Sequence, residues 1–338
     1  MINQIKMKNY GPLQDISWSS LSNINLIIGG NGTGKTFLLK ALYSSMRTLE
    51  EYKRGQEQRS AADILADKLH WTFQQDKVGD LVTKGADSAL SLNISVDERD
   101  FSYSFGSGTT KSITSIENHV APRSTNSVFL PPKEVLSLQN IIIESREIRK
   151  EFGFDDTYYD LAKAISYGTS RGKNYEEFAK SRVNLEEILN GKVEYDDVKK
   201  TWQFKNKKNQ KFQIGVTAEG IKKIAILDSL LGNRYLSPGS IIFIDEPESA
   251  LHPTAISKLM DIISVLSKRG IQFFIASHSY FVIKKLYLIA QEKNESIPVI
   301  SFSKDEWKYD DLKNCMPENP IIAESTALYV QEVEIKLG

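Results

Sequence analysis

The sequence predicts an α/β protein with a mostly parallel sheet, an antiparallel β subdomain and a helical lobe. Strand-length runs of mainly apolar residues at 24–28, 241–244 and 271–276 indicate buried strands. Segments with apolar residues at helical spacing alternate with these runs, and they span 37–49, 221–231 and 255–266. Strands that alternate with helices along a chain are typical of a parallel sheet.

The middle of the sequence predicts the antiparallel β subdomain and the helical lobe. Residues 89–105 alternate as strands do, with Leu90, Leu92, Ile94 and Val96 on one face. Residues 134–190 are dominated by helical patterns, after a strand at 128–130 that two prolines stop.

A hairpin is expected next, with 192–194 or 201–204 as one arm, a polar turn at 206–210 and 211–216 as the other arm. Near the end of the chain, a strand at 299–302 and a helix at 324–335 are expected. These patterns divide the chain into an N-terminal lobe (1–135), a helical lobe (136–200) and a C-terminal lobe (201–338).

Composition and charge narrow the class of protein. Hydrophobic residues make up 41% of the chain and charged residues 25%, as in ordinary globular proteins. The apolar runs fall short of the ~20 residues that span a bilayer, and the N-terminus lacks a secretory pattern, so we expect a cytoplasmic protein without a membrane partner. The single cysteine, Cys315, excludes an internal disulfide and a cysteine zinc cluster, so a bound metal would have oxygen ligands. The 43 basic residues balance 43 acidic ones, so the protein has no net positive charge that would attract nucleic acid.

Residues 29–36, with the sequence GGNGTGKT, have the spacing of a Walker A motif. They lie between an apolar strand and a helix, a context that disfavours the alternative of an ordinary glycine-rich turn. Backbone N–H groups of such a loop face a triphosphate, Lys35 reaches the β- and γ-phosphates, and Thr36 offers its hydroxyl to Mg²⁺. The residues expected to bind ATP here are Gly29, Asn31, Gly32, Thr33, Gly34, Lys35, Thr36 and Phe37.

Two further strands end in residues suited to hydrolysis. Asp245 and Glu246 follow the strand 241–244, where Asp245 would position Mg²⁺ and Glu246 would orient and polarise the attacking water. Taken alone, this pair is an ordinary solvated strand end, but its place downstream of a Walker A motif favours Walker B. His278 follows the strand 271–276 and could bond the γ-phosphate, although a lone histidine is more often structural.

These three motifs together resemble the ABC-type ATPase superfamily, over most of the chain. Residues 245–253, DEPESALHP, are similar to the Glu-Pro-Glu…Leu-His-Pro segment of RecF-like and overcoming-lysogenisation-defect ATPases, rather than to transporter heads. The resemblance implies an ABC-type ATPase head with a P-loop sheet. It also implies that 249–252 is the D-loop, that His278 is the switch histidine, and that two heads form a homodimer or higher oligomer with ATP between them.

In that family a signature motif from the opposite head completes each nucleotide site. The candidate is 217–220, TAEG, and the resemblance places Gly220 against the ATP of the other head. Ala218 stands where the family usually has serine, so a side-chain contact to phosphate would be missing unless Thr217 supplies it. The alternative is that Thr217 is a plain helix N-cap. For the family's Q-loop glutamine, Gln139 is the candidate.

Two charged segments have alternative explanations. The basic stretch could bind nucleic acid, or it could be the solvated face of a hairpin whose aromatic residues are buried, and the second explanation is favoured. It contains Lys199, Lys200, Lys205, Lys207, Lys208 and Lys211, with Trp202, Phe204 and Phe212 between them. The acidic segment 154–160 could hold a second metal, but capping of a helix is favoured.

Two classes of function follow from the resemblance. We expect the ATPase component of a bacterial anti-phage defence system of the Septu or Gabija kind, which would control a separate effector protein, a nuclease or toxin. The alternative is a stand-alone DNA-repair or chromosome-associated ATPase. About sixty residues follow His278, too few for the nuclease domain often fused to such heads, and the lack of long heptad runs argues against a coiled-coil arm.

Overall fold

The central sheet has six strands, five of them parallel. The computed structural model describes residues 1–13, 15–168, 176–196, 198–199, 201–304 and 306–337. The parallel strands, in spatial order, are β13 (Pro298–Ser303), β3 (Ile24–Ile28), β12 (Gln272–Ser277), β11 (Ile241–Asp245) and β7 (Ser127–Leu130). An antiparallel strand, β14 (Glu306–Asp311), forms the edge beside β13. The predicted α/β class with a mostly parallel sheet is therefore confirmed.

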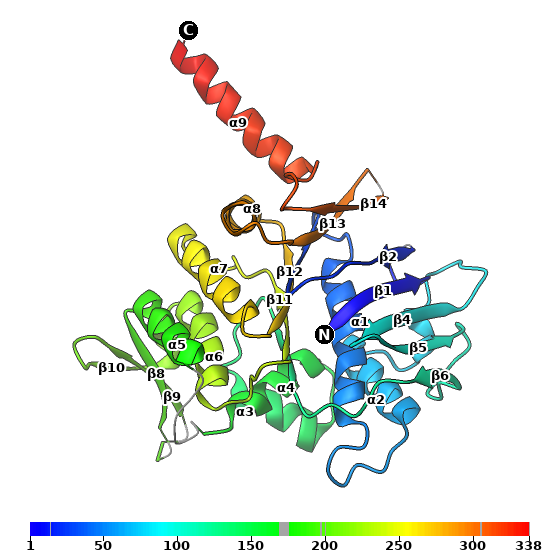
Figure 1. The fold of residues 1–338 in the computed structure, drawn as a ribbon. Coiled ribbons are helices and arrows are strands. Elements are labelled where there is room, and N and C mark those ends of the chain that lie inside the picture. The colour runs from blue at the N-terminus through cyan, green and yellow to red at the C-terminus, as the bar shows by residue number, and fades with distance from the viewer. Residues whose placement is uncertain (14, 169–175, 197, 200, 305, 338) are drawn as a thin grey trace.

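The central strands β3, β11 and β12 are buried throughout because both faces of the sheet are covered. In β11, Ile242 and Ile244 belong to one hydrophobic core, whereas Ile241 and Phe243 belong to a second core on the other face. Helices on the first face are α6 (Glu219–Gly232), α7 (Pro253–Ser267) and α8 (Tyr280–Lys293). On the second face, α1 (Lys35–Glu51) runs between the central sheet and the antiparallel sheet (Figure 1).

The antiparallel sheet has the order β2-β1-β4-β5-β6. Its strands are β1 (Ile2–Lys8), β2 (Ile16–Trp18), β4 (Leu90–Val96), β5 (Arg99–Phe105) and β6 (Ser115–Asn118). Asp97 and Glu98 join β4 to β5 with φ values of 51° and 63°, as a two-residue hairpin turn requires. The alternation predicted for 89–105 is confirmed, since every second residue of β4 is buried.

The helical lobe contains α3 (Gln139–Glu144), a π-helical turn (Ser145–Arg149), α4 (Asp156–Ile165) and α5 (Glu176–Leu189). It is followed by a three-stranded sheet of β8 (Gly191–Asp196), β9 (Thr201–Asn206) and β10 (Lys211–Gln213), with β9 in the centre. Both candidate first arms of the hairpin are therefore strands. The predicted second arm was too long, because Ile214–Val216 is a 3₁₀ turn that leads into α6.

The favoured explanation of the basic stretch holds only in part. Trp202 and Phe204 are buried, but Phe212 remains 42% exposed because β10 is a short edge strand. Lys200 of this stretch lies outside the described residues.

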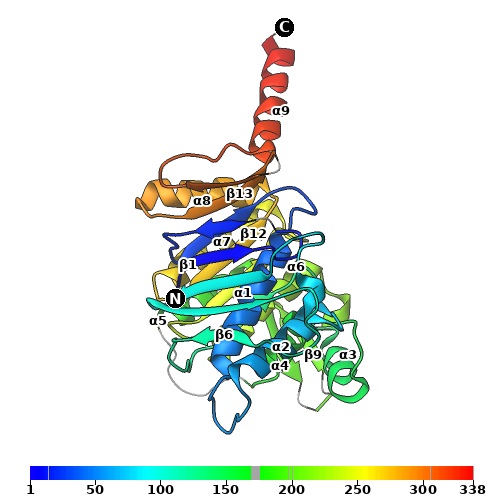
Figure 2. The same cartoon turned by 90° about the vertical axis from the view of Figure 1, so that its right-hand side faces the viewer.

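Sequence patterns missed the helices α2 (Ala61–Phe73) and α8 and the strands β2, β6 and β14. The signal for α2 was present as a capping box, in which Ser60 and Asp63 bond each other's backbone N–H groups. The predicted terminal helix is α9 (Pro320–Leu337), which extends away from the rest of the molecule in both views (Figures 1 and 2). A short 3₁₀ turn, Val78–Leu81, follows α2.

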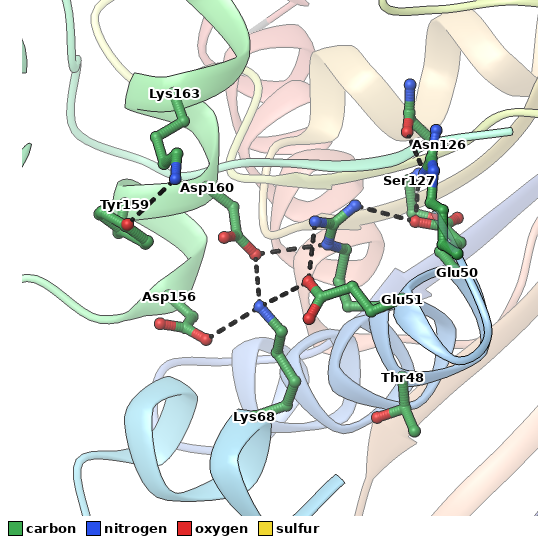
Figure 3. Close-up of polar contacts among 12 residues, drawn as sticks. Thr48, Glu50, Glu51, Lys68, Asn126, Ser127, Asp156, Tyr159, Asp160 and Lys163 are labelled. Carbon is green, nitrogen blue, oxygen red and sulfur yellow. Dashed lines mark hydrogen bonds and ion pairs between the residues drawn. The ribbon is translucent and has the colours of Figure 1, made fainter. Parts of the chain in front are cut away.

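A buried ion cluster joins α1, α2 and α4 (Figure 3). Lys68 lies 2.9 Å from Glu51 and 3.3 Å from both Asp156 and Asp160, and Arg47 lies 3.4 Å from Asp160. The acidic segment 154–160 was expected to cap a helix, and this is confirmed at Asp155. Its side chain caps α4 by accepting a hydrogen bond from the Thr157 N–H. Within the described residues, no group of three or more histidine, cysteine or carboxylate side chains is arranged to hold a metal.

Candidate nucleotide site

The glycine-rich loop 29–34 leaves the carboxyl end of β3 and enters α1 directly. Gly32 and Gly34 have φ values of 78° and 90°, in the left-handed region that favours glycine. At Gly34 a Cβ atom would lie 2.6 Å from Cδ2 of Leu13, so both backbone conformation and space exclude a side chain. Glycine is therefore required at position 34 for the loop to turn directly into α1.

Lys35 begins α1 and folds back over this loop. Its ammonium group donates hydrogen bonds to the carbonyl oxygens of Gly29 and Gly30, at 2.8 and 2.7 Å. Burial lowers the pKa of Lys35, while the nearby carboxylates of Asp245, Glu246 and Glu248 oppose that shift. A buried cation at the centre of a glycine-rich loop is suited to a phosphate chain.

Thr36 and Asp245 meet at the same edge of the sheet. The Thr36 hydroxyl donates a hydrogen bond of 2.7 Å to Oδ2 of Asp245, which ends β11. The other oxygen, Oδ1, is buried and has no hydrogen-bond partner in the described part of the chain. Burial raises the pKa of Asp245 to about 6. An unpartnered carboxylate oxygen beside a hydroxyl is the donor set that Mg²⁺ prefers, so these residues fit the metal that the motif implies.

Glu246, Glu248 and His278 form a cluster beside this pair. Nδ1 of His278 lies 3.4 Å from Oε1 of Glu246 and 3.6 Å from Oε1 of Glu248. Glu248 also accepts hydrogen bonds from the Ser277 hydroxyl and from the His278 N–H. These bonds fix the backbone where β12 ends and His278 follows. The side chains of Glu246 and His278 are 32% and 41% exposed, which leaves them accessible to water and substrate.

Ala218, not Thr217, is the N-cap of α6. The Thr217 hydroxyl donates to the carbonyl of Ile214, and no side chain caps the helix, so the N-cap interpretation of Thr217 was wrong. Ala218 is exposed, whereas Gly220 is buried against the loop that follows Walker B. A Cβ atom on Gly220 would lie 2.6 Å from the carbonyl oxygen of Ala250 in the same chain. Contact of Gly220 with the nucleotide of a second head stays a prediction.

Three other predicted site residues lie in distinct surroundings. Asn31 is exposed at the tip of the loop. The ring of Phe37 packs against Phe73, with ring centres 4.5 Å apart, so only its backbone N–H remains for a ligand. Gln139 is buried, where its amide donates to Ala162 and Ser166 of the helical lobe and accepts from the indole N–H of Trp202 in β9. These contacts lend no support to the Q-loop interpretation of Gln139.

Two residues of the site were not predicted. Glu248 could have been found, because it lies in the Glu-Pro-Glu segment that carried the resemblance. Lys223 has no sequence signal. Its ammonium group lies 3.4 Å from the carbonyl oxygen of Glu246, and burial lowers its pKa to about 8, against the opposing charges of Glu248, Glu246 and Asp245.

The loop, the Thr36–Asp245 pair and the parallel sheet together define a P-loop ATPase head. A family model described as "AAA domain, putative AbiEii toxin, Type IV TA system" matches residues 24–284, and the chain belongs to this family. Among curated proteins, it is similar to the DNA replication and repair protein RecF of Bacillus cytotoxicus, with 24% identity over 197 residues. The match covers 57% of this chain and 46% of RecF, so the chain spans about half the length of that relative.

Solved structures resemble the fold over nearly its whole length. The Smc head bound to the C-winged helix domain of ScpA has a TM-score of 0.53 and 14% identity, over 92% of this chain and 97% of that one. The recombination mediator RecF with ATP has a TM-score of 0.46 and 14% identity, over 92% of this chain and 99% of that one. At this identity the Smc likeness establishes the fold alone, that of an ABC-type ATPase head.

Among the described residues, none of the helices combines the length and the apolar character needed to cross a membrane.

Proposed function

We propose that this chain binds ATP with Mg²⁺ and hydrolyses it to ADP and phosphate. The observation that carries the proposal is the Thr36–Asp245 pair, whose unpartnered Oδ1 lies beside a glycine-rich loop with Lys35 at its centre. Family membership supports nucleotide hydrolysis in general. An ordinary glycine-rich turn would not need a buried, half-satisfied carboxylate next to it, because such a group costs stability.

Each residue of the cluster has a distinct role in the proposed reaction. Lys35 and the loop N–H groups bind the phosphates, and Thr36 with Asp245 would hold Mg²⁺, which when bound neutralises phosphate charge. Glu246 accepts a hydrogen bond from the attacking water and polarises it. His278, whose Nδ1 lies 3.4 Å from Oε1 of Glu246, would orient that carboxylate and donate a hydrogen bond to a phosphate oxygen as charge develops there.

The same proposal includes pairing of two heads across ATP. No side chain caps the first N–H groups of α6, and Ala218 and Glu219 at its start are exposed. An uncapped helix N-terminus of this length attracts anions, since its free N–H groups carry partial positive charge. The start of α6 in one head would therefore close the γ-phosphate site of the other, either in a homodimer or in a higher oligomer.

For the biological role, we favour the ATPase component of a bacterial anti-phage defence complex. In that role ATP binding and hydrolysis control a separate effector protein, a nuclease or toxin. The family description, which names a toxin of a type IV TA system, supports control of a harmful activity. The second candidate is a DNA-repair or chromosome-associated ATPase that acts on nucleic acid, and the similarity to RecF supports it.

Phosphate release by the purified chain, with Mg²⁺ and with excess EDTA, tests the reaction. We expect ATP-dependent release that EDTA abolishes and that Glu246→Gln lowers at least about 100-fold. Absence of ATP binding to the wild-type chain would overturn the proposal.

Phage challenge of cells that carry the gene with its neighbours tests the favoured role, with Glu246→Gln as the control. Stimulation of ATPase activity by duplex DNA, without protection from phage, would favour the second role.

A further inference from the structure

We propose that Lys223 is a positioning residue that couples the start of α6 to the loop bearing Glu246, and thereby sets the rate of hydrolysis. The inference rests on the proposed function. Lys223 belongs to α6, the helix whose N-terminus would face a second head, while Glu246 belongs to the loop after β11. The two segments are in contact within one chain.

The helix touches this loop, residues 246–250, at two points on one face. Gly220 lies so close to the carbonyl of Ala250 that a Cβ atom would be 2.6 Å from it. One turn later, Nζ of Lys223 lies 3.4 Å from the carbonyl oxygen of Glu246. Residues three apart share a helix face, so both contacts act from the same side of α6. Movement of the helix start therefore moves both ends of the loop.

The loop needs such support because its backbone is strained. Glu246 has a φ of 49° and Ala250 a φ of 63°, in the left-handed region that side chains disfavour. The carbonyl of Glu246 accepts hydrogen bonds from the Ser249 N–H, at 3.0 Å, and from Lys223. These bonds stabilise the conformation that directs the Glu246 side chain toward His278.

Charge strengthens the coupling. Lys223 is the cation of α6 that faces the carboxylates of Asp245, Glu246 and Glu248 together. Its stem lines a small apolar cavity of about 40 Å³ with Leu130, Leu227 and Leu251, where water gives little screening. Loss of the ammonium group would leave three clustered carboxylates less balanced and the Glu246 carbonyl with one donor fewer.

The consequence is a path from a partner head to the catalytic glutamate. Ala218 is exposed at the start of α6, whereas Gly220 and Lys223 are turned toward the loop of their own chain. A nucleotide that binds the exposed end of α6 shifts the helix, and Lys223 transmits that shift to Glu246. Lys223 acts through the backbone of Glu246, so its effect is on positioning.

The test compares Lys223→Met, which keeps the stem but removes the donor and the charge, with Lys223→Arg. We expect Lys223→Met to lower kcat at least tenfold while KM and ATP affinity stay within threefold. Lys223→Arg should recover most of the rate, because it retains a donor. Lys258→Met, at an exposed position of α7, is the matched control and should match the wild type.

Hydrogen exchange provides a readout that needs no activity. Without nucleotide, the Ser249 and Leu251 amides should exchange faster in Lys223→Met than in the wild type, while amides of β11 stay protected. Unchanged kcat and unchanged exchange in Lys223→Met would overturn the inference, as would a higher KM at constant kcat. Failure of Lys223→Arg to recover the rate would indicate packing instead of coupling. Absence of hydrolysis in the wild type, with faster exchange in Lys223→Met, would count against the proposed function alone.

Discussion

Thr36 and Asp245, 209 residues apart in the chain, are joined by a hydrogen bond of 2.7 Å between Oγ1 and Oδ2. They meet because β3 and β11 lie parallel on either side of β12, so their carboxyl ends reach the same edge of the sheet. The remaining oxygen of Asp245 is buried without a partner in the described part of the chain. The fold therefore holds a carboxylate whose ionisation costs stability, because burial raises its pKa.

Asp245→Asn should stabilise the nucleotide-free fold at high pH while it removes Mg²⁺-dependent ATP binding. The pKa of Asp245 is raised by burial from 3.8 to about 6. The folded state therefore retains a proton that the unfolded state has lost, and stability falls as pH rises from about 4 to about 6. The difference of roughly two pKa units amounts to at most about 3 kcal/mol.

Urea denaturation of the wild type and of Asp245→Asn measures whether the variant is the more stable protein at high pH. At pH 8 we expect the free energy of unfolding of Asp245→Asn to exceed that of the wild type by about 1–3 kcal/mol. At pH 4 the wild-type carboxyl is protonated and the two values should converge. A variant that is less stable than the wild type at pH 8 would show that the carboxylate is stabilised in the folded chain.

Lys35→Ala should weaken ATP binding about 100-fold, because a charge-assisted contact to phosphate is lost, about 2.7 kcal/mol. Isothermal titration would measure the affinity and circular dichroism the fold. Lys6→Ala, at an exposed position of β1, is the control and should bind ATP normally. A folded Lys35→Ala protein with unchanged affinity would contradict the assignment of the loop.

Glu246→Gln should retain ATP and release phosphate at least about 100-fold more slowly, since an amide cannot polarise water as a carboxylate does. The measurement is single-turnover hydrolysis alongside ATP affinity. Glu292→Gln, exposed at the end of α8, should hydrolyse ATP at the wild-type rate. Wild-type turnover by Glu246→Gln would assign the catalytic role to another residue.

Ala218→Arg should abolish ATP-dependent association of heads and leave ATP binding by a single head nearly unchanged. The exposed N-cap of α6 is a better probe than Gly220, because a side chain at Gly220 would collide with Ala250 of its own chain. Light scattering of Glu246→Gln protein, with and without ATP, measures association with and without Ala218→Arg. Ala323→Arg, on exposed α9, is the matched control. Equal association in all three proteins would contradict pairing through α6.

Asp160→Asn should destabilise the fold by about 3–5 kcal/mol, because it leaves the buried cations Lys68 and Arg47 less balanced. Arg59→Gln, which removes surface ion pairs with Glu57 and Asp67, should cost far less, because water screens such pairs. Thermal and urea unfolding would measure both. Equal losses in the two variants would show that the buried cluster gives no special stability.

Local patterns were sufficient for much of the fold and the site. The strands β3, β11 and β12 were predictable because burial on both faces favours runs in which most residues are apolar. The loop 29–36 was predictable because its glycines and its Lys-Thr pair must be adjacent to wrap a phosphate. The lobe boundaries at 135 and 200, the roles of Glu246 and His278, and contact of Gly220 with ATP stay predictions.

By itself, the sequence determined the α/β class, the phosphate loop and the acidic strand end, since each depends on neighbouring residues and on a periodicity of about two or 3.6 residues. Only the tertiary structure brought Thr36 to Asp245 and packed Gly220 against Ala250. It also placed the Lys223 ammonium group beside the carbonyl oxygen of Glu246. It also buried Lys68 among three carboxylates of two other helices. Such contacts depend on strand order and helix packing, which are set by the free energy of the whole core and not by any local run of residues.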